Sequence, residues 1–124
     1  MTYQPAHPVV WSEIPVTDLE AASEFYARVT GMALRLDEVG PQPIMIFMGA
    51  EETGIAGHLY AGTPAKDDAG PTIHFAAHGT LEEVTTRVWD AGGQVVSDPI
   101  PVPDGRFIYC KDPDGNSIGL FEAA

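Results

Sequence analysis

Residues 9–20 read VVWSEIPVTDLE, and residues 72–83 read TIHFAAHGTLEE. Each stretch begins with a run typical of a β-strand and continues into a threonine followed three residues later by a glutamate, the pattern of a helix capping box. Thr17 corresponds to Thr80, and the same offset relates the two glutamates. Such a repeat predicts two matching modules that share one core, with a cavity where their sheets meet.

Apolar residues at helical spacing follow each capping box. The first helix is predicted to begin at Thr17 or Asp18 and to end at Gly31, and the second is predicted to run from Thr80 to Gly92. The rest of each half predicts strands, so the element order is βαβββ twice. Besides the strands that open each half, they are predicted at residues 33–38, 44–49, 55–60, 94–97, 106–111 and 117–121.

A segment rich in Gly, Pro and Asp, residues 62–71, is interpreted as the linker between the modules. Module one then spans about residues 8–61 and module two about residues 72–122, within a single domain covering residues 1–124. The proline-rich residues 99–103 predict a bend. The predicted fold class is therefore α+β.

The strongest compositional feature is charge: six Lys and Arg face 18 Asp and Glu, a net charge of −12. Nucleic acid and an acidic membrane surface are disfavoured as partners, because both are bound through basic residues. The field of such a protein attracts cationic small molecules. The N-terminus does not resemble a signal peptide, and Cys110 is the only cysteine, so a reducing cytoplasmic location is expected.

Residues 13–20 (EIPVTDLE), followed by Phe25, Tyr26 and Gly31, resemble the opening of the vicinal oxygen chelate superfamily. That superfamily includes glyoxalase I, extradiol dioxygenases and bleomycin-resistance proteins. Residues 111–120 (KDPDGNSIGL) are similar to its closing hairpin. The small glyoxalase-related proteins of unassigned substrate are the branch with the greatest similarity.

The resemblance implies a cupped, partly open mixed β-barrel with helices outside and a small-molecule ligand. It also implies a homodimer, because members commonly pair modules across subunits. A divalent metal (Zn, Ni, Fe or Mn) typically lies inside, held by a His or Glu from the first and last strands of each module.

This sequence departs from the superfamily at those ligand positions. They fall at Trp11, near Gly57, at Thr72 and at Gly119, if strand alternation places Trp11, Glu13 and Pro15 toward the cavity. Side chains of these types do not hold a divalent ion of this kind. No metal ligand and no cofactor are therefore expected, and the divalent metal remains the alternative that the superfamily suggests.

Glu13 and His74 are the candidate catalytic residues, because each lies two residues from a lost ligand position and shares its face. They are interpreted as a general base with a partner, or as two ligands of a displaced metal site with His58 as the third. The competing interpretation is a satisfied polar pair in the cavity wall. The predicted ligand-binding residues are Trp11, Phe47, His58, Thr72, Tyr109, Gly119 and Phe121, although aromatic residues on strands are often plain core.

Two functions fit these features. The first is a glyoxalase-like or dioxygenase-like enzyme, a lyase or an oxidoreductase acting on a small oxygenated compound, with Glu13 as acid or base and His74 assisting. The alternative is a non-catalytic protein of the bleomycin-resistance type that binds or sequesters a small molecule. The charge of −12 and the lost metal ligands suit the second.

Overall fold

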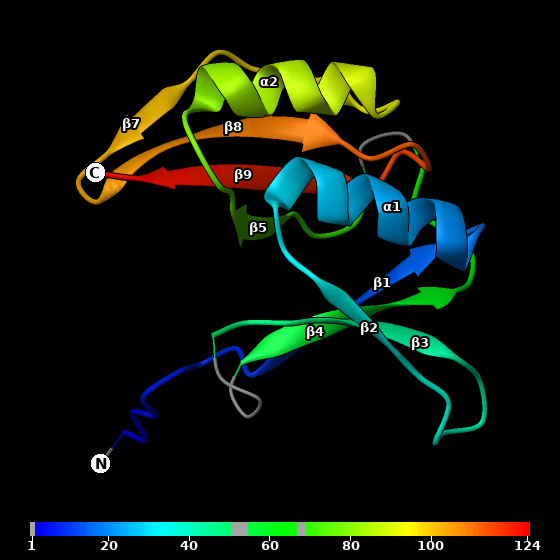
Figure 1. The fold of residues 1–124 in the computed structure, drawn as a ribbon. Helices are drawn as coiled ribbons and strands as arrows, with labels where there is room; N and C mark the ends of the chain where they lie inside the picture. The colour runs from blue at the N-terminus through cyan, green and yellow to red at the C-terminus, as the bar shows by residue number, and fades with distance from the viewer. Residues whose placement is uncertain (1, 51–54, 67–68) are drawn as a thin grey trace.

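The computed structural model describes residues 2–50, 55–66 and 69–124 (Figure 1). Two mixed sheets and two helices form the predicted α+β fold, and the sheets are cupped without closing into a barrel within this part of the chain. The first half contains β1 (Trp11–Val16), α1 (Leu19–Thr30), β2 (Leu34–Asp37), β3 (Ile44–Phe47) and β4 (Ala56–Ala61). The second half contains β5 (Ile73–Ala76), α2 (Leu81–Asp90), β6 (Gln94–Val95), β7 (Ile100–Val102), β8 (Gly105–Lys111) and β9 (Ser117–Ala123).

Each half forms its own sheet with the same topology. Sheet A has the order β1-β4-β3-β2 and sheet B the order β5-β9-β8-β6. In each sheet the first strand of that half of the chain pairs in parallel with its last strand. The proline-rich segment differs from the predicted bend, because residues 100–102 form β7 and pair with β8. Pro101 is tolerated in β7 because this strand lies outside the main strand order, so its nitrogen needs no ladder partner.

α1 ends at Gly31 as predicted, and α2 ends at Asp90 with Ala91 as its C-cap, just before the predicted Gly92. α1 begins after Asp18, one of the two predicted residues, but the capping box predicted at Thr17 does not form. Asp18 rather than Thr17 caps α1 and accepts from the backbone N–H of Ala21, while the Thr17 hydroxyl donates to Asp114. Thr17 and Asp18 are adjacent and both could cap the helix. Because the Thr17 hydroxyl bonds to Asp114 across the fold, Asp18 provides the cap. The capping box of α2 at Thr80 is confirmed. Gly31 ends α1 with a φ of 83°, the left-handed conformation that glycine adopts without steric cost.

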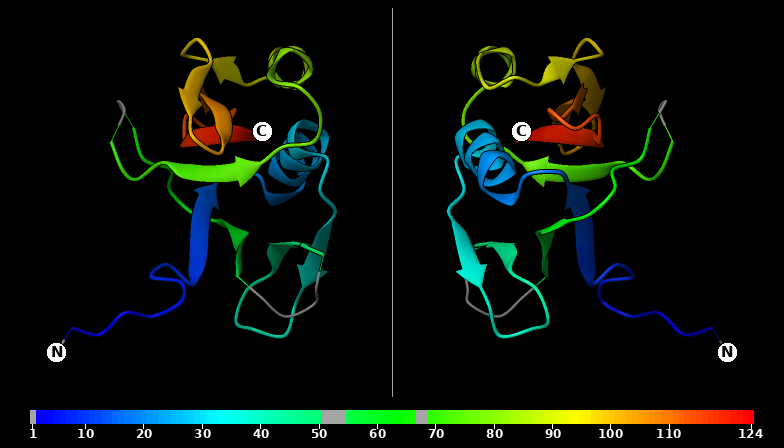
Figure 2. Two further views of the ribbon diagram at one scale, coloured as in Figure 1. Left: turned by 90° about the vertical axis from the view of Figure 1, so that its left-hand side faces the viewer. Right: turned by 90° about the vertical axis from the view of Figure 1, so that its right-hand side faces the viewer.

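The core lies between the sheets and the helices. α1 packs against β3 and β4, α2 packs against β6, β8 and β9, and the two helices contact each other. The rings of Tyr26, Phe47 and Phe75 meet at the centre, with centroids 4.8–5.5 Å apart, and join the two halves. Each helix covers one face of its sheet, and within the described chain the opposite face carries no helix (Figures 1 and 2).

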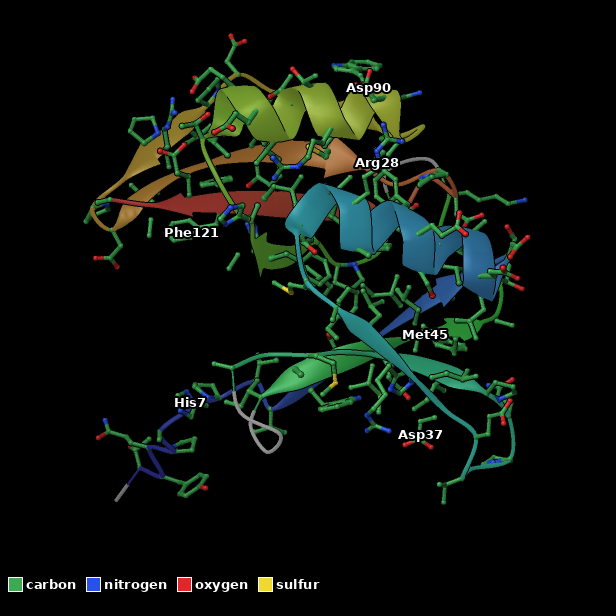
Figure 3. The ribbon with its side chains drawn as sticks, viewed as in Figure 1. His7, Arg28, Asp37, Met45, Asp90 and Phe121 are labelled. Carbon is green, nitrogen blue, oxygen red and sulfur yellow. The ribbon has the colours of Figure 1, made fainter. Side chains whose placement is uncertain are left out.

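Strand alternation assigns side chains to the two kinds of face. On β1, Ile14 and Val16 are buried, whereas Trp11 and Glu13 are exposed on the other side. We call this uncovered side of sheet A face A and the uncovered side of sheet B face B. Figure 3 shows the alternation in sheet A, where Met45 points toward α1 and Asp37 away from it.

The turn between β8 and β9 ties sheet B to the first half of the chain. Asp112 is 3% exposed, and its carboxylate accepts from the Tyr26 hydroxyl at 2.7 Å, from two backbone N–H groups of the turn and from the Asn116 amide. The Asn116 amide also donates to the Pro15 carbonyl at 2.8 Å. This network fixes the end of β1 against the closing hairpin. Neither described helix is long and apolar enough to cross a membrane.

Candidate functional site

Face A carries a chain of three hydrogen-bonded side chains. The parallel register of β1 and β4 places Glu13 opposite His58. The Trp11 indole Nε1 donates to His58 Nδ1 at 2.9 Å, and His58 Nε2 lies 3.2 Å from Glu13 Oε1. An indole can only donate, so Nδ1 accepts, and the imidazole proton lies on Nε2, directed at Glu13. This geometry describes a neutral His58 and leaves the negative charge of Glu13 in place.

Glu13 and His58, two of these three hydrogen-bonded side chains, differ sharply in solvent exposure. The His58 side chain is 12% exposed, whereas the Glu13 side chain is 66% exposed. The indole of Trp11 is tilted against the imidazole at a centroid distance of 5.9 Å, and the ring of Tyr60 meets it edge-on at 6.1 Å. A largely buried imidazole therefore fixes an exposed carboxylate between two aromatic residues of face A.

Face B is built from rings around a glycine. His74 pairs with Gly119, and its imidazole occupies the space that a Cβ at Gly119 would need. The imidazole also contacts Phe107 and Tyr109 edge-on, at centroid distances of 5.0 and 5.8 Å. Phe121 follows Gly119 by two residues on the same face, on the side of β9 away from α2 (Figure 3). The missing side chain of Gly119 leaves the space that the His74 imidazole occupies.

The two catalytic candidates from the sequence lie on different sheets. Glu13 pairs with His58 on sheet A, and the neighbours of His74 are the rings of Phe107 and Tyr109 on sheet B. Sequence reasoning missed Tyr60 and Phe107, although their spacing of two from His58 and Tyr109 places each on the same face as its neighbour.

The two remaining ligand positions, Thr72 and Gly57, also lack a metal-binding side chain. The Thr72 hydroxyl shares a 2.6 Å hydrogen bond with the Ser117 hydroxyl. Gly57 pairs with Ser12 and faces the core side of sheet A, so the expected cavity position on the fourth strand belongs to His58 instead. A shift of one residue along a strand moves a side chain to the opposite face, which explains this difference.

Residues 6–120 match the family model of the Glyoxalase/Bleomycin resistance protein/Dioxygenase superfamily. The chain belongs to this superfamily. A search of curated protein sequences gave no significant match.

Solved structures share the fold at low sequence identity. A hypothetical protein, SA1046 from S. aureus, is 19% identical with a TM-score of 0.67, covering 94% of this chain and 96% of its own. TnmS3, an antibiotic binding protein from Streptomyces sp. CB03234, is 24% identical with a TM-score of 0.67, covering 98% and 100%. A glyoxalase/bleomycin resistance protein from Albidiferax ferrireducens T118 is 21% identical with a TM-score of 0.67, covering 93% and 98%.

The side chains that the structure describes do not fit the divalent metal that many members of the superfamily bind. Among the described residues, no three His, Cys, Asp or Glu side chains lie close enough together to hold a metal ion. On face A the Trp11 indole occupies the Nδ1 atom of His58. On face B the imidazole of His74 fills the space above Gly119, where a longer ligand side chain would have to lie.

A cavity of about 440 Å³ is lined by residues of both sheets, and His74 of face B is part of its lining. Phe47 and Thr72, both predicted to bind a ligand, line this cavity together with Ser12, Ile73 and Phe75.

Cys110 is fully buried on β8, and burial raises the pKa of its thiol to about 12. A thiol of this kind stays protonated at neutral pH, so it does not act as a nucleophile.

Proposed function

We propose that this protein binds a small organic molecule on faces A and B and holds it without a catalytic metal. The observation that carries the proposal is the Trp11–His58 hydrogen bond. The residue at the first ligand position of the superfamily has no metal-binding atom, and it engages the histidine that could have replaced it. What remains on both faces is a surface of rings, the kind of lining that suits a flat organic ligand.

The fold provides a precedent for this role. TnmS3, described as an antibiotic binding protein, has the same architecture over almost the whole chain. At 24% identity this likeness concerns the fold alone, so the support comes from the ring-lined faces themselves.

We further propose that the functional form is a homodimer. Trp11 on face A is 41% exposed, and Tyr109 on face B is 37% exposed. Large apolar side chains on uncovered sheet faces are typical of surfaces that a partner or a ligand covers. In a homodimer, face A of one subunit lies opposite face B of the other and encloses the ligand between them. Sedimentation equilibrium tests this arrangement, and a monomer at micromolar concentration contradicts it.

Metal analysis combined with ligand screening tests the proposed function. Protein purified without chelators is expected to contain no stoichiometric Zn, Ni, Fe or Mn. Compounds with aromatic rings are expected to raise the melting temperature, as any ligand that binds the folded state does. Trp11→Leu and Tyr109→Leu should each reduce this shift. The matched control is Trp89→Leu, because Trp89 is 55% exposed on α2, away from both faces.

Two results contradict the proposal. One is stoichiometric Zn, Ni, Fe or Mn in the purified protein. The other is a set of thermal shifts that both face variants leave unchanged.

One observation favours a second candidate function, acid–base catalysis on a small oxygenated compound. Glu13 and His58 form a carboxylate–imidazole pair at 3.2 Å, a common arrangement for positioned proton transfer. Glu13 would act as the base, and His58, rather than the expected His74, would be its partner. This candidate requires a substrate whose turnover Glu13→Gln abolishes while the melting temperature stays unchanged. Turnover that survives this substitution would exclude it.

A further inference from the structure

Face A contains a negative charge that no positive charge in its own sheet offsets. The hydrogen bond from Trp11 makes His58 a neutral donor, so the contact between His58 and Glu13 is a hydrogen bond to a carboxylate and not an ion pair. Glu13 therefore keeps its full charge, although an imidazole holds it in place. The only basic residue in the strands of sheet A is Arg35 on β2, the far edge strand, and Arg35 already pairs with Asp37 at 3.7 Å.

The surroundings of Glu13 define the ligand group that would satisfy this charge. Its side chain is 66% exposed, so a carboxylate oxygen is open to an incoming donor. Trp11 lies two residues before it on β1, and Tyr60 lies diagonally across on β4. Both aromatic residues share face A with Glu13, within the reach of neighbouring side chains on one sheet face. A carboxylate between two aromatic residues recognises a flat cation, because the carboxylate accepts its N–H groups and the rings attract its charge.

We propose that Glu13 is the specificity-determining residue of face A, that it selects ligands bearing a protonated amine or amidine on an aromatic ring, and that Trp11 and His58 are its positioning residues. This inference rests on the proposed binding function and adds the ligand class to it. Trp11 acts in two ways: its ring lines the face, and its N–H fixes the imidazole tautomer that directs the second nitrogen at Glu13. The net charge of −12 acts in the same direction by concentrating cations near the protein.

Two probes of nearly the same shape separate charge from ring binding: benzamidine, a cation at neutral pH, and the neutral benzamide. Both are titrated into the full-length ¹⁵N-labelled protein at low salt, and affinities are taken from backbone and indole amide shifts. Benzamidine is expected to bind about threefold or more tightly than benzamide, the scale of a partly exposed charge contact. Glu13→Gln should bring this ratio to about one and leave benzamide affinity unchanged. The control Glu24→Gln removes the same charge from an exposed position on α1 and should preserve the ratio.

The positioning role has its own readout. Long-range ¹⁵N spectra of the imidazole report which ring nitrogen carries the proton. Wild-type His58 is expected to show the proton on Nε2, and Trp11→Phe should give a mixture of tautomers together with a reduced cation preference. A fixed tautomer in Trp11→Phe with an unchanged ratio would overturn the positioning role.

The outcomes separate this inference from the function on which it rests. If both probes bind equally well, or if the preference survives Glu13→Gln, Glu13 does not select cations, while binding on the face stands. If neither probe shifts residues of face A or face B, both this inference and the proposed binding function are overturned.

Discussion

The substitution Tyr26→Phe tests the link between the two halves of the fold. The Tyr26 hydroxyl and the Asp112 carboxylate form a buried 2.7 Å hydrogen bond, with exposures of 0% and 3%. A hydrogen bond to a charged group contributes about 1.5–3 kcal/mol. Asp112 keeps three other donors after the substitution, so we expect a loss in the lower part of that range, about 2 kcal/mol.

This loss predicts a clear thermal shift. Unfolding entropies near 2.1 cal/mol/K per residue give about 0.26 kcal/mol/K for this chain of 124 residues, so 2 kcal/mol lowers the melting temperature by about 8 °C. Urea denaturation and calorimetry at pH 7 measure both quantities. Tyr3→Phe is the matched control, because Tyr3 is 86% exposed, and it should change stability by less than about 0.5 kcal/mol.

Two further measurements complete the test. Asp112→Asn should lower the free energy of unfolding more than Tyr26→Phe does. An asparagine amide has one oxygen where the carboxylate has two, so its NH2 group would face side-chain donors that now bond to a carboxylate oxygen. Burial and the neighbouring Asp112 raise the pKa of Tyr26 well above 10. The contribution of the Tyr26 hydroxyl to the free energy of unfolding is therefore complete below pH 10 and is lost as the pH rises further. The difference in this free energy between wild type and Tyr26→Phe, the stability gap, should then narrow. A gap below about 0.5 kcal/mol at pH 7, or one that widens in alkali, refutes this reasoning.

Two further predictions concern buried positions. Gly57→Ala should destabilise the fold strongly and lower the yield of folded protein, because the added Cβ would lie 2.6 Å from the Ser12 carbonyl oxygen on the paired strand. The control is Gly40→Ala, because a Cβ at Gly40 would have no atom within 4 Å. Equal melting curves for the two variants in circular dichroism would contradict this prediction. Cys110 should react with a thiol reagent at pH 8 only after unfolding, and rapid native reaction would show that it is accessible. Burial raises the pKa of the Cys110 thiol from 9.0 to about 12, so the protonated thiol contributes fully to the free energy of unfolding below pH 9 and progressively less above it. Urea titrations at alkaline pH should therefore show a smaller loss of stability in Cys110→Ala than in the wild type.

The sequence alone determined the two-module organisation and the sidedness of the first strand. Capping residues and turn glycines act through local backbone geometry, so the second capping box and the stop at Gly31 could be identified from neighbouring residues. Alternation has a strict period of two, so burying Ile14 and Val16 necessarily turns Trp11 and Glu13 to the other side. These features depend on a few consecutive residues and need no knowledge of the rest of the fold.

Only the tertiary structure decided which residues meet on each face. The register between β1 and β4 pairs Glu13 with His58, and it is set by packing between strands far apart in the chain. A slip of one residue would have placed Gly57 there instead and turned the imidazole into the core. The same holds for His74, whose place above Gly119 follows from the pairing of β5 with β9. Local sequence fixes the side of the sheet to which a residue points, whereas long-range pairing fixes its neighbours, and the chemistry of this site depends on those neighbours.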